Sequence, residues 1–158
     1  MVNVFSGSEI VEMGINIEKN GRDFYRELVK SSKSKTAQEV FGLLAREEES
    51  HIKTFEGMLS TVKKYEPSEA YPGEYFAYIK SLASEYVFTK ENKGLDIAKS
   101  AKGDLEAIQL GIGFEKDSIL FYSEMKKFVL KGEQKIVDRL LEEEKIHLRK
   151  LNELKGRL

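Results

Sequence analysis

Apolar side chains recur every three or four residues along most of this chain, which is the period of one face of an α-helix. Four stretches carry the pattern, at about residues 8–30, 36–65, 104–129 and 133–155. A helix with one apolar face is stable in water only when that face is buried against another element. The pattern therefore predicts an all-α protein, built as a four-helix bundle.

The lengths of the connections predict how these helices pair. Only a few residues separate the first stretch from the second and the third from the fourth. Short connections favour antiparallel neighbours, so we expect two helical hairpins. The connection over about residues 66–103 is long, weakly periodic and contains both prolines, Pro67 and Pro72. We expect a single domain over residues 1–158, in which this crossover joins the hairpins.

Two local signals refine the expected helices. The segment FAYIKSLASEYVF, residues 76–88, favours a short helix across the bundle within the crossover. At the start of the first helix, Ser6 and Glu9 have the spacing of a capping box, in which each side chain bonds the backbone of the other residue.

The two hairpins resemble each other in sequence. INIEKNGRDFYREL, residues 15–28, aligns with IGFEKDSILFYSEM, residues 112–125, and LAREEESHIKTF, from Leu44, aligns with LLEEEKIHLRKL, from Leu140. The sequence separation between matched residues is one residue shorter in the second alignment than in the first. These alignments pair the same polar residues in both halves: Glu18 with Glu115, Tyr25 with Tyr122, Glu48 with Glu144 and His51 with His147.

The chain contains two histidines, and each follows a glutamate by three residues on a helical segment. Three residues make almost one helical turn, so Glu48 and His51 share a face, as do Glu144 and His147. Glu18 lies among apolar positions of the first helix, where an unpaired carboxylate costs several kcal/mol to bury.

The matched glutamate of the third helix, Glu115, faces the same cost. Together the four carboxylates and two imidazoles balance two divalent cations in charge, and the donor set suits iron, with manganese as the second choice.

This doubled motif resembles that of the ferritin-like di-iron carboxylate proteins, and most closely the rubrerythrin group. In that architecture two helices each supply a Glu and two others each supply a Glu-x-x-His. The resemblance covers about residues 8–154. It implies a ferritin-like bundle with two iron ions, bridged by Glu48 and Glu144. The implied metal ligands are Glu18, Glu48, His51, Glu115, Glu144 and His147.

Tyr25 and Tyr122 lie seven residues after Glu18 and Glu115, two turns along the same face. Their hydroxyls are placed to hydrogen-bond a ligand carboxylate of the opposite hairpin, with a buried core tyrosine as the alternative. The chain departs from classical rubrerythrins at Ser118, where they carry an additional Glu one turn after the third-helix ligand.

Composition narrows the functions further. The chain has no cysteine, which excludes disulfides, thiolate zinc sites and iron–sulfur clusters. It also excludes the rubredoxin module of classical rubrerythrins, so an external electron donor is expected. The net charge is -1, with 26 basic and 27 acidic residues, so we expect neither nucleic acid nor membrane as a partner. The start of the sequence carries no signal-peptide pattern, and we expect a cytoplasmic protein.

Three functions stay open at this point. The resemblance implies an enzyme that reduces hydrogen peroxide or O2 at a di-iron site, in oxidative-stress defence. The second is a ferroxidase that handles or stores iron, and the third is a helical interaction module that makes no use of metals. We expect a homodimer.

Two further groups of residues lie near the predicted ligands. The glutamates next to the predicted ligands are expected to be surface residues, and Gly14, Gly111 and Gly113 to allow close helix approach or access to the metals. The neighbouring glutamates are Glu47, Glu49, Glu142 and Glu143.

Overall fold

A computed structural model describes residues 7–64, 77–79, 81–82 and 92–158 of the 158-residue chain. Four long helices dominate this part of the chain, and it contains no β-strand. Short helices also occur, namely α4 (Lys93–Ser100) and the two 3-10 helices η1 (Lys126–Phe128) and η2 (Lys131–Glu133). The all-α class is therefore confirmed. The long helices are α1, Gly7–Ser31, α2, Lys35–Lys64, α5, Asp104–Met125, and α6, Gln134–Arg157.

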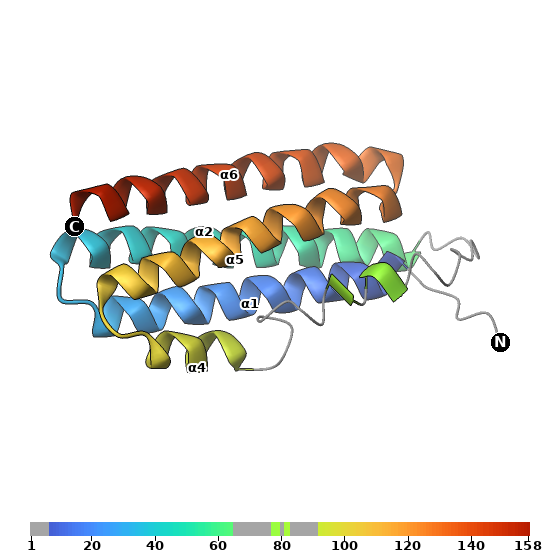
Figure 1. Ribbon diagram of the computed structural model, residues 1–158. Coiled ribbons are helices and arrows are strands. Elements are labelled where there is room, and N and C mark those ends of the chain that lie inside the picture. The colour runs from blue at the N-terminus through green and yellow to red at the C-terminus, as the bar shows by residue number, and fades with distance from the viewer. Residues whose placement is uncertain (1–6, 65–76, 80, 83–91) are drawn as a thin grey trace.

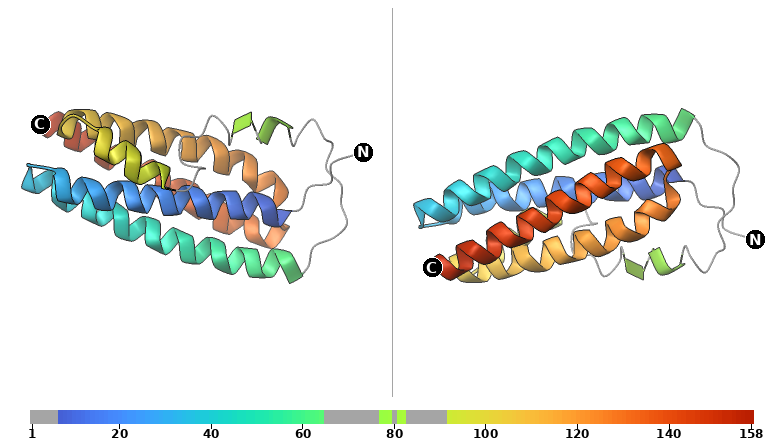
Figure 2. Two further views of the ribbon diagram at one scale, coloured as in Figure 1. Left: turned by 90° about the horizontal axis from the view of Figure 1, so that it is seen from below. Right: turned by 90° about the horizontal axis from the view of Figure 1, so that it is seen from above.

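The long helices form two antiparallel hairpins that lie side by side (Figure 1). Helices α1 and α2 make one hairpin and α5 and α6 the other, and these are the two most extensive helix pairs. Both views in Figure 2 show the same four helices packed as a bundle, and α4 lies along α1. The predicted pairing of the helices is correct.

The turn between α1 and α2 is held by its own serines. Ser34 Oγ accepts a hydrogen bond of 3.2 Å from the backbone N–H of Ala37, which is the N-cap arrangement for α2. The backbone N–H of Ser34 also donates to Asp104 Oδ2 at 3.2 Å. Since Asp104 begins α5, this contact ties the first turn to the start of the second hairpin.

Helix α4 lies inside the predicted crossover and was not expected there. It is docked on α1, where the backbone N–H of Gly94 donates a hydrogen bond of 2.9 Å to the buried Asn20 Oδ1. A Cβ on residue 94 would lie 2.0 Å from the carbonyl oxygen of Asn20, so only glycine allows this approach. The helix depends on a contact distant in sequence, which local periodicity does not record.

Other boundaries differ by a few residues. The α-helical part of the third long helix ends at Met125 rather than near residue 129, and the chain continues as the 3-10 turn η1. Within the expected helix at 76–88, residues 77–79 and 81–82 are helical. The remainder of that segment and the capping residue Ser6 lie outside the described residues.

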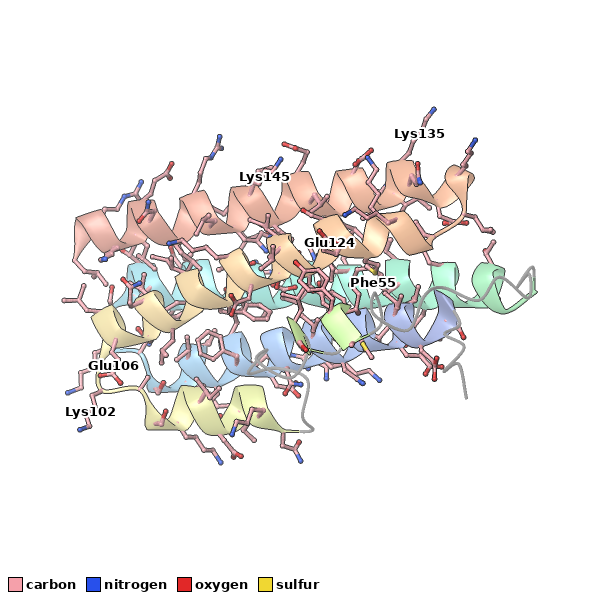
Figure 3. All side chains as sticks on the ribbon, turned by 45° about the vertical axis from the view of Figure 1, so that its right-hand side comes forward. Phe55, Lys102, Glu106, Glu124, Lys135 and Lys145 are labelled. Carbon is pink, nitrogen blue, oxygen red and sulfur yellow. The ribbon has the colours of Figure 1, made fainter. Side chains whose placement is uncertain are left out.

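Apolar side chains from all four long helices fill the middle of the bundle. The largest are aromatic, and Figure 3 shows Phe55 inside the bundle while Lys135 of α6 points away from it. No helix in the described ranges has the length and apolar composition that crossing a membrane requires. The largest aromatic side chains that solvent does not reach are Phe24, Tyr25, Phe41, Phe55, Phe114, Phe121 and Tyr122.

Candidate metal centre

Six ionisable side chains meet at the centre of this apolar core. Each of the four long helices contributes, and every one of the six is at most 2% exposed. Helices α1 and α5 give one carboxylate each, and α2 and α6 give a Glu-x-x-His pair each. The structure thus brings together all six predicted ligands, namely Glu18, Glu48, His51, Glu115, Glu144 and His147.

The six residues form two overlapping sets of four. One set adds Glu18 and His51 to the pair Glu48 and Glu144, and the other adds Glu115 and His147 to the same pair. In each set one ligand atom per residue lies within 4.8 Å of all the others. Because Glu48 and Glu144 belong to both sets, they are the carboxylates that two neighbouring ions would share.

Among the described residues, eight buried side-chain atoms lack a hydrogen-bond partner, and all belong to this cluster. Some of them lie close together, as His51 Nδ1 and Glu144 Oε1 do at 2.9 Å, without the geometry of a hydrogen bond. Buried polar atoms are almost always hydrogen-bonded, so eight exceptions in one place need an explanation. The eight atoms are Glu18 Oε2, Glu115 Oε2, both carboxylate oxygens of Glu48 and of Glu144, and the Nδ1 atoms of His51 and His147.

These eight atoms fit a pair of divalent cations. Each ion would take one imidazole nitrogen, one oxygen of its own carboxylate and one oxygen of each shared carboxylate. Four carboxylates also carry the charge that neutralises two such ions, and oxygen with imidazole donors suits iron and manganese. The donor set is therefore that of a di-metal site.

Without cations, the cluster is electrostatically strained. Burial raises the pKa of Glu18 well above its ordinary value, and the charges of Glu48 and Glu144 raise it further. Burial and the charge of Glu144 likewise raise the pKa of Glu115.

The histidines balance part of this negative charge. Burial alone would lower the pKa of His51, but the charge of Glu18 and the nearby Glu144 outweigh it, so the pKa of His51 is raised. The pKa of His147 is also raised, because the charge of Glu115 outweighs burial. In the metal-free protein the raised pKa values therefore favour the protonated forms of both histidines.

Two tyrosines join the hairpins at the cluster. Tyr25 of α1 donates a hydrogen bond of 2.5 Å to Glu115 Oε1 on α5, and Tyr122 of α5 donates one to Glu18 Oε1 on α1. Both rings are fully buried. The predicted contact of each hydroxyl with a carboxylate of the opposite hairpin is present, and each leaves the second oxygen of that carboxylate for another partner.

Two of the neighbouring glutamates have a role that the sequence did not suggest. Glu143 Oε2 lies 2.7 Å from His51 Nε2, and Glu47 Oε2 lies 2.8 Å from His147 Nε2. Both side chains are only partly exposed, at 42% and 36%. They lie at the surface, as expected, but each carboxylate also caps a buried histidine of the opposite hairpin.

The other two glutamates pair with basic side chains instead of with the histidines. Glu142 is 69% exposed and pairs with Lys145 at 2.6 Å. Glu49 binds Arg22 at 3.0 Å on α1. Neither carboxylate reaches the cluster in any contact that the structure records between described residues.

The histidines also line a surface pocket between α2 and α6. Its volume is about 240 Å³, and it lies on the outer side of both imidazoles. The carboxylates that cap the histidines form part of its wall. The lining residues are Glu47, Ser50, His51, Glu143, Ile146 and His147.

The glycines near the site differ in their surroundings. A Cβ on Gly111 would lie 3.2 Å from Leu151 Cδ1, which reflects close helix packing, whereas one on Gly113 would meet nothing within 4 Å. Gly14 makes ordinary contacts with Phe55. The tightest position in this region was not singled out from the sequence: a Cβ on Gly21 would lie 2.5 Å from Phe114 Cζ.

A bundle with one Glu from each of two helices and a Glu-x-x-His from each of the others defines a ferritin-like protein of the di-iron carboxylate class. Comparison with known proteins agrees. The chain matches the Rubrerythrin family over residues 9–155, and it belongs to that family.

A solved structure gives a second comparison. It is the crystal structure of a candidate ferritin-like diiron-carboxylate protein from Thermotoga maritima, to which this chain is 28% identical, with a TM-score of 0.73. The match covers 97% of this chain and 96% of the other. No curated protein matches the chain significantly.

Proposed function

We propose that this protein binds two iron ions in the central cluster and uses them to reduce hydrogen peroxide or O2. The observation that carries the proposal is the set of eight buried, unpartnered ligand atoms, which has the number and arrangement that two cations need. Iron is the first choice and manganese the second, because the donors are carboxylate and imidazole. The chain's family supports the same assignment.

The proposed roles follow the two sets of ligands. Glu18 and His51 would hold one ion and Glu115 and His147 the other, with Glu48 and Glu144 available to both. Tyr25 and Tyr122 fix the orientation of Glu115 and Glu18 through their hydroxyls. The surrounding aromatic side chains keep bulk water from the ligands.

The proposed reaction is a two-electron reduction. Hydrogen peroxide with two electrons and two protons gives two waters, and a ferrous pair supplies both electrons when bound. An external donor then restores them, since the chain has no cysteine to carry a rubredoxin-type centre of its own. This requires a separate redox protein or small reductant as partner.

Metal content per chain, measured on protein purified without chelator, tests the first part of the proposal. Ferrous loading and anaerobic titration with peroxide, then with O2, test the second. Two irons per chain with rapid oxidation by peroxide support the enzyme. Less than one metal per chain, no gain on loading and no loss in a Glu48→Ala, Glu144→Ala double variant would leave a helical scaffold.

Ser118 favours a second candidate, a ferroxidase that passes oxidised iron onward. It is fully buried in α5 three residues after Glu115, where classical rubrerythrins carry their additional Glu. Without that extra carboxylate the site has four carboxylates rather than five. The two functions separate in the product: a ferroxidase releases ferric ions and consumes ferrous ions in excess of two per chain, whereas a peroxidase retains its iron over many turnovers.

We also propose a homodimer. Leu105 and Leu120 of α5 are 56% and 48% exposed. Covering them with a second copy would remove this apolar surface from water. Mass measured by light scattering after size-exclusion chromatography tests the assembly, and a large hollow particle would instead favour iron storage.

A further inference from the structure

The carboxylates that cap the two histidines are arranged crosswise between the hairpins. Glu47 of α2 reaches His147 of α6, and Glu143 of α6 reaches His51 of α2, at 2.8 and 2.7 Å from the Nε2 atoms. Each capping residue immediately precedes the shared carboxylate of its own helix, Glu48 or Glu144. The arrangement therefore repeats in both halves of the chain.

The chemistry of this contact fixes where the imidazole proton lies. An ionised carboxylate only accepts hydrogen bonds, so each Nε2 must carry the proton and donate it. In a neutral imidazole that leaves the lone pair on Nδ1, the atom that faces the cluster and is unpartnered there in both histidines. A nitrogen binds a metal only through such a lone pair.

A basic side chain lies near each capping carboxylate. Lys150 Nζ lies 3.3 and 3.4 Å from the two oxygens of Glu47, and Arg139 Nε lies 3.9 Å from Glu143 Oε1. Lys150 and Arg139 both belong to α6. Each carboxylate thus lies between a basic side chain and a buried histidine, and the closer of the two cations, Lys150, hydrogen-bonds Glu47.

We propose that Glu47 and Glu143 are positioning residues, and that each sets the metal-binding tautomer and ring orientation of the histidine in the opposite hairpin. Glu47 then affects the metal ion that His147 would bind, and Glu143 the ion that His51 would bind. Each capping residue nevertheless lies beside the Glu-x-x-His motif that contains the other histidine. The inference rests on the proposed function in one respect, that the cluster binds two metal ions.

Cobalt(II) binding, followed by its visible absorption, tests this in variants that keep one complete metal position. His147→Ala leaves the position of Glu18 and His51, and His51→Ala leaves that of Glu115 and His147. Loss of a carboxylate partner of a metal-bound histidine typically weakens metal affinity by about 10–100-fold. In the His51→Ala background we expect that loss from Glu47→Met and none from Glu143→Met, and in the His147→Ala background the reverse.

Conservative and matched variants complete the test. Glu47→Gln keeps an acceptor oxygen and should recover part of the affinity that Glu47→Met loses. Glu49→Met and Glu142→Met remove neighbouring glutamates that touch neither histidine, and they should leave both affinities unchanged. Equal losses in both backgrounds, or losses as large in the matched variants, would overturn the proposal.

The cobalt titrations distinguish failure of the proposed metal site from failure of the positioning role alone. If the unmodified protein binds no cobalt, the proposed function itself fails. If it binds two ions and Glu47→Met binds them as tightly in the His51→Ala background, only the positioning role fails. Helical content by circular dichroism checks that each variant is folded, which is expected because both substituted side chains are partly exposed.

Discussion

The hydroxyl of Tyr25 donates a 2.5 Å hydrogen bond to Glu115 Oε1, and this bond links the first helix to the helix that begins the second hairpin. Both groups are fully buried. Burial and the neighbouring charge of Glu115 raise the pKa of Tyr25 well above its ordinary value, so the phenol keeps its proton and serves as donor. The bond holds one oxygen of Glu115 and leaves the other for a metal.

Tyr25→Phe should destabilise the protein by about 1–3 kcal/mol, because it leaves a buried carboxylate oxygen without its donor. The ring remains, so packing against Phe24 and Phe41 is preserved. Urea unfolding of the metal-free protein measures the change. Tyr122→Phe should behave alike, since its hydroxyl donates to Glu18. Unchanged midpoints in both variants would show that the carboxylates find other donors.

The four long helices were predictable because each buries a continuous apolar stripe that local sequence records. Helix α4 was not, since it forms where Gly94 meets Asn20, a residue 74 positions away in sequence. The same reasoning explains the third helix. Its α-helical hydrogen bonds stop at Met125 although buried Val129 continues the apolar pattern, so periodicity alone extended it too far.

The central cluster was accessible from sequence because its motif occurs twice. Glu18 and Glu115 became visible only through the internal repeat, since a single carboxylate on an apolar face gives a weak signal. The capping role of Glu47 and Glu143 was not accessible. On its own helix each residue is one position before a ligand, about 100° around the axis, and only the facing helix supplies the histidine that it contacts.

The stability of the metal-free protein should fall as pH rises from about 5 to 9. The pKa values of Glu18 and Glu115 are raised by burial, so the folded state keeps their protons above the ordinary value of 4.5 while the unfolded state releases them. The raised pKa values of His51 and His147 act in the same direction above 6.5. Each shift favours folding at low pH, and that advantage is lost as pH rises.

Two other carboxylates do not cancel this trend. Burial would raise the pKa values of Glu48 and Glu144, but close neighbours in the cluster, His51 and His147 among them, outweigh it and lower both, so the contribution of these two groups is complete above 4.5. Urea midpoints at about pH 5.5, 7 and 8.5 in the presence of chelator measure the slope. With metal added the slope should reverse, since metal binding requires these groups deprotonated. Urea midpoints of the metal-free protein that do not change with pH would contradict the raised pKa values in the cluster.

Two glycines inside helices should respond to alanine with opposite signs. Gly21→Ala places a Cβ 2.5 and 2.8 Å from ring atoms of buried Phe114, beside Glu115, and should cost about 1–3 kcal/mol of stability through overpacking. Gly113→Ala meets nothing within 4 Å and should gain about 0.5–1 kcal/mol from helix propensity. Thermal unfolding of the two variants side by side provides the measurement. Equal effects would mean that Phe114 moves aside without cost.

Glu18→Gln should raise the stability of the metal-free protein and lower that of the metal-loaded protein. The amide keeps an oxygen for the Tyr122 hydroxyl, and unlike Glu18, whose pKa is raised by burial and by Glu48 and Glu144, it does not have to take up a proton when the chain folds at neutral pH. Wild-type protein at 100 times its metal dissociation constant should gain about 2.7 kcal/mol per ion from binding, and a chelator should remove that gain.

In the variant, the metal-dependent part of this gain should shrink because one of the ligands of the first ion is lost. Melting temperatures with ferrous or cobalt(II) ions and with chelator supply both quantities, and Glu39→Gln, at an exposed position on α2, is the matched control. A variant that loses stability without metal would contradict the raised pKa of Glu18. A variant with the full metal-dependent gain would show instead that Glu18 is not a ligand.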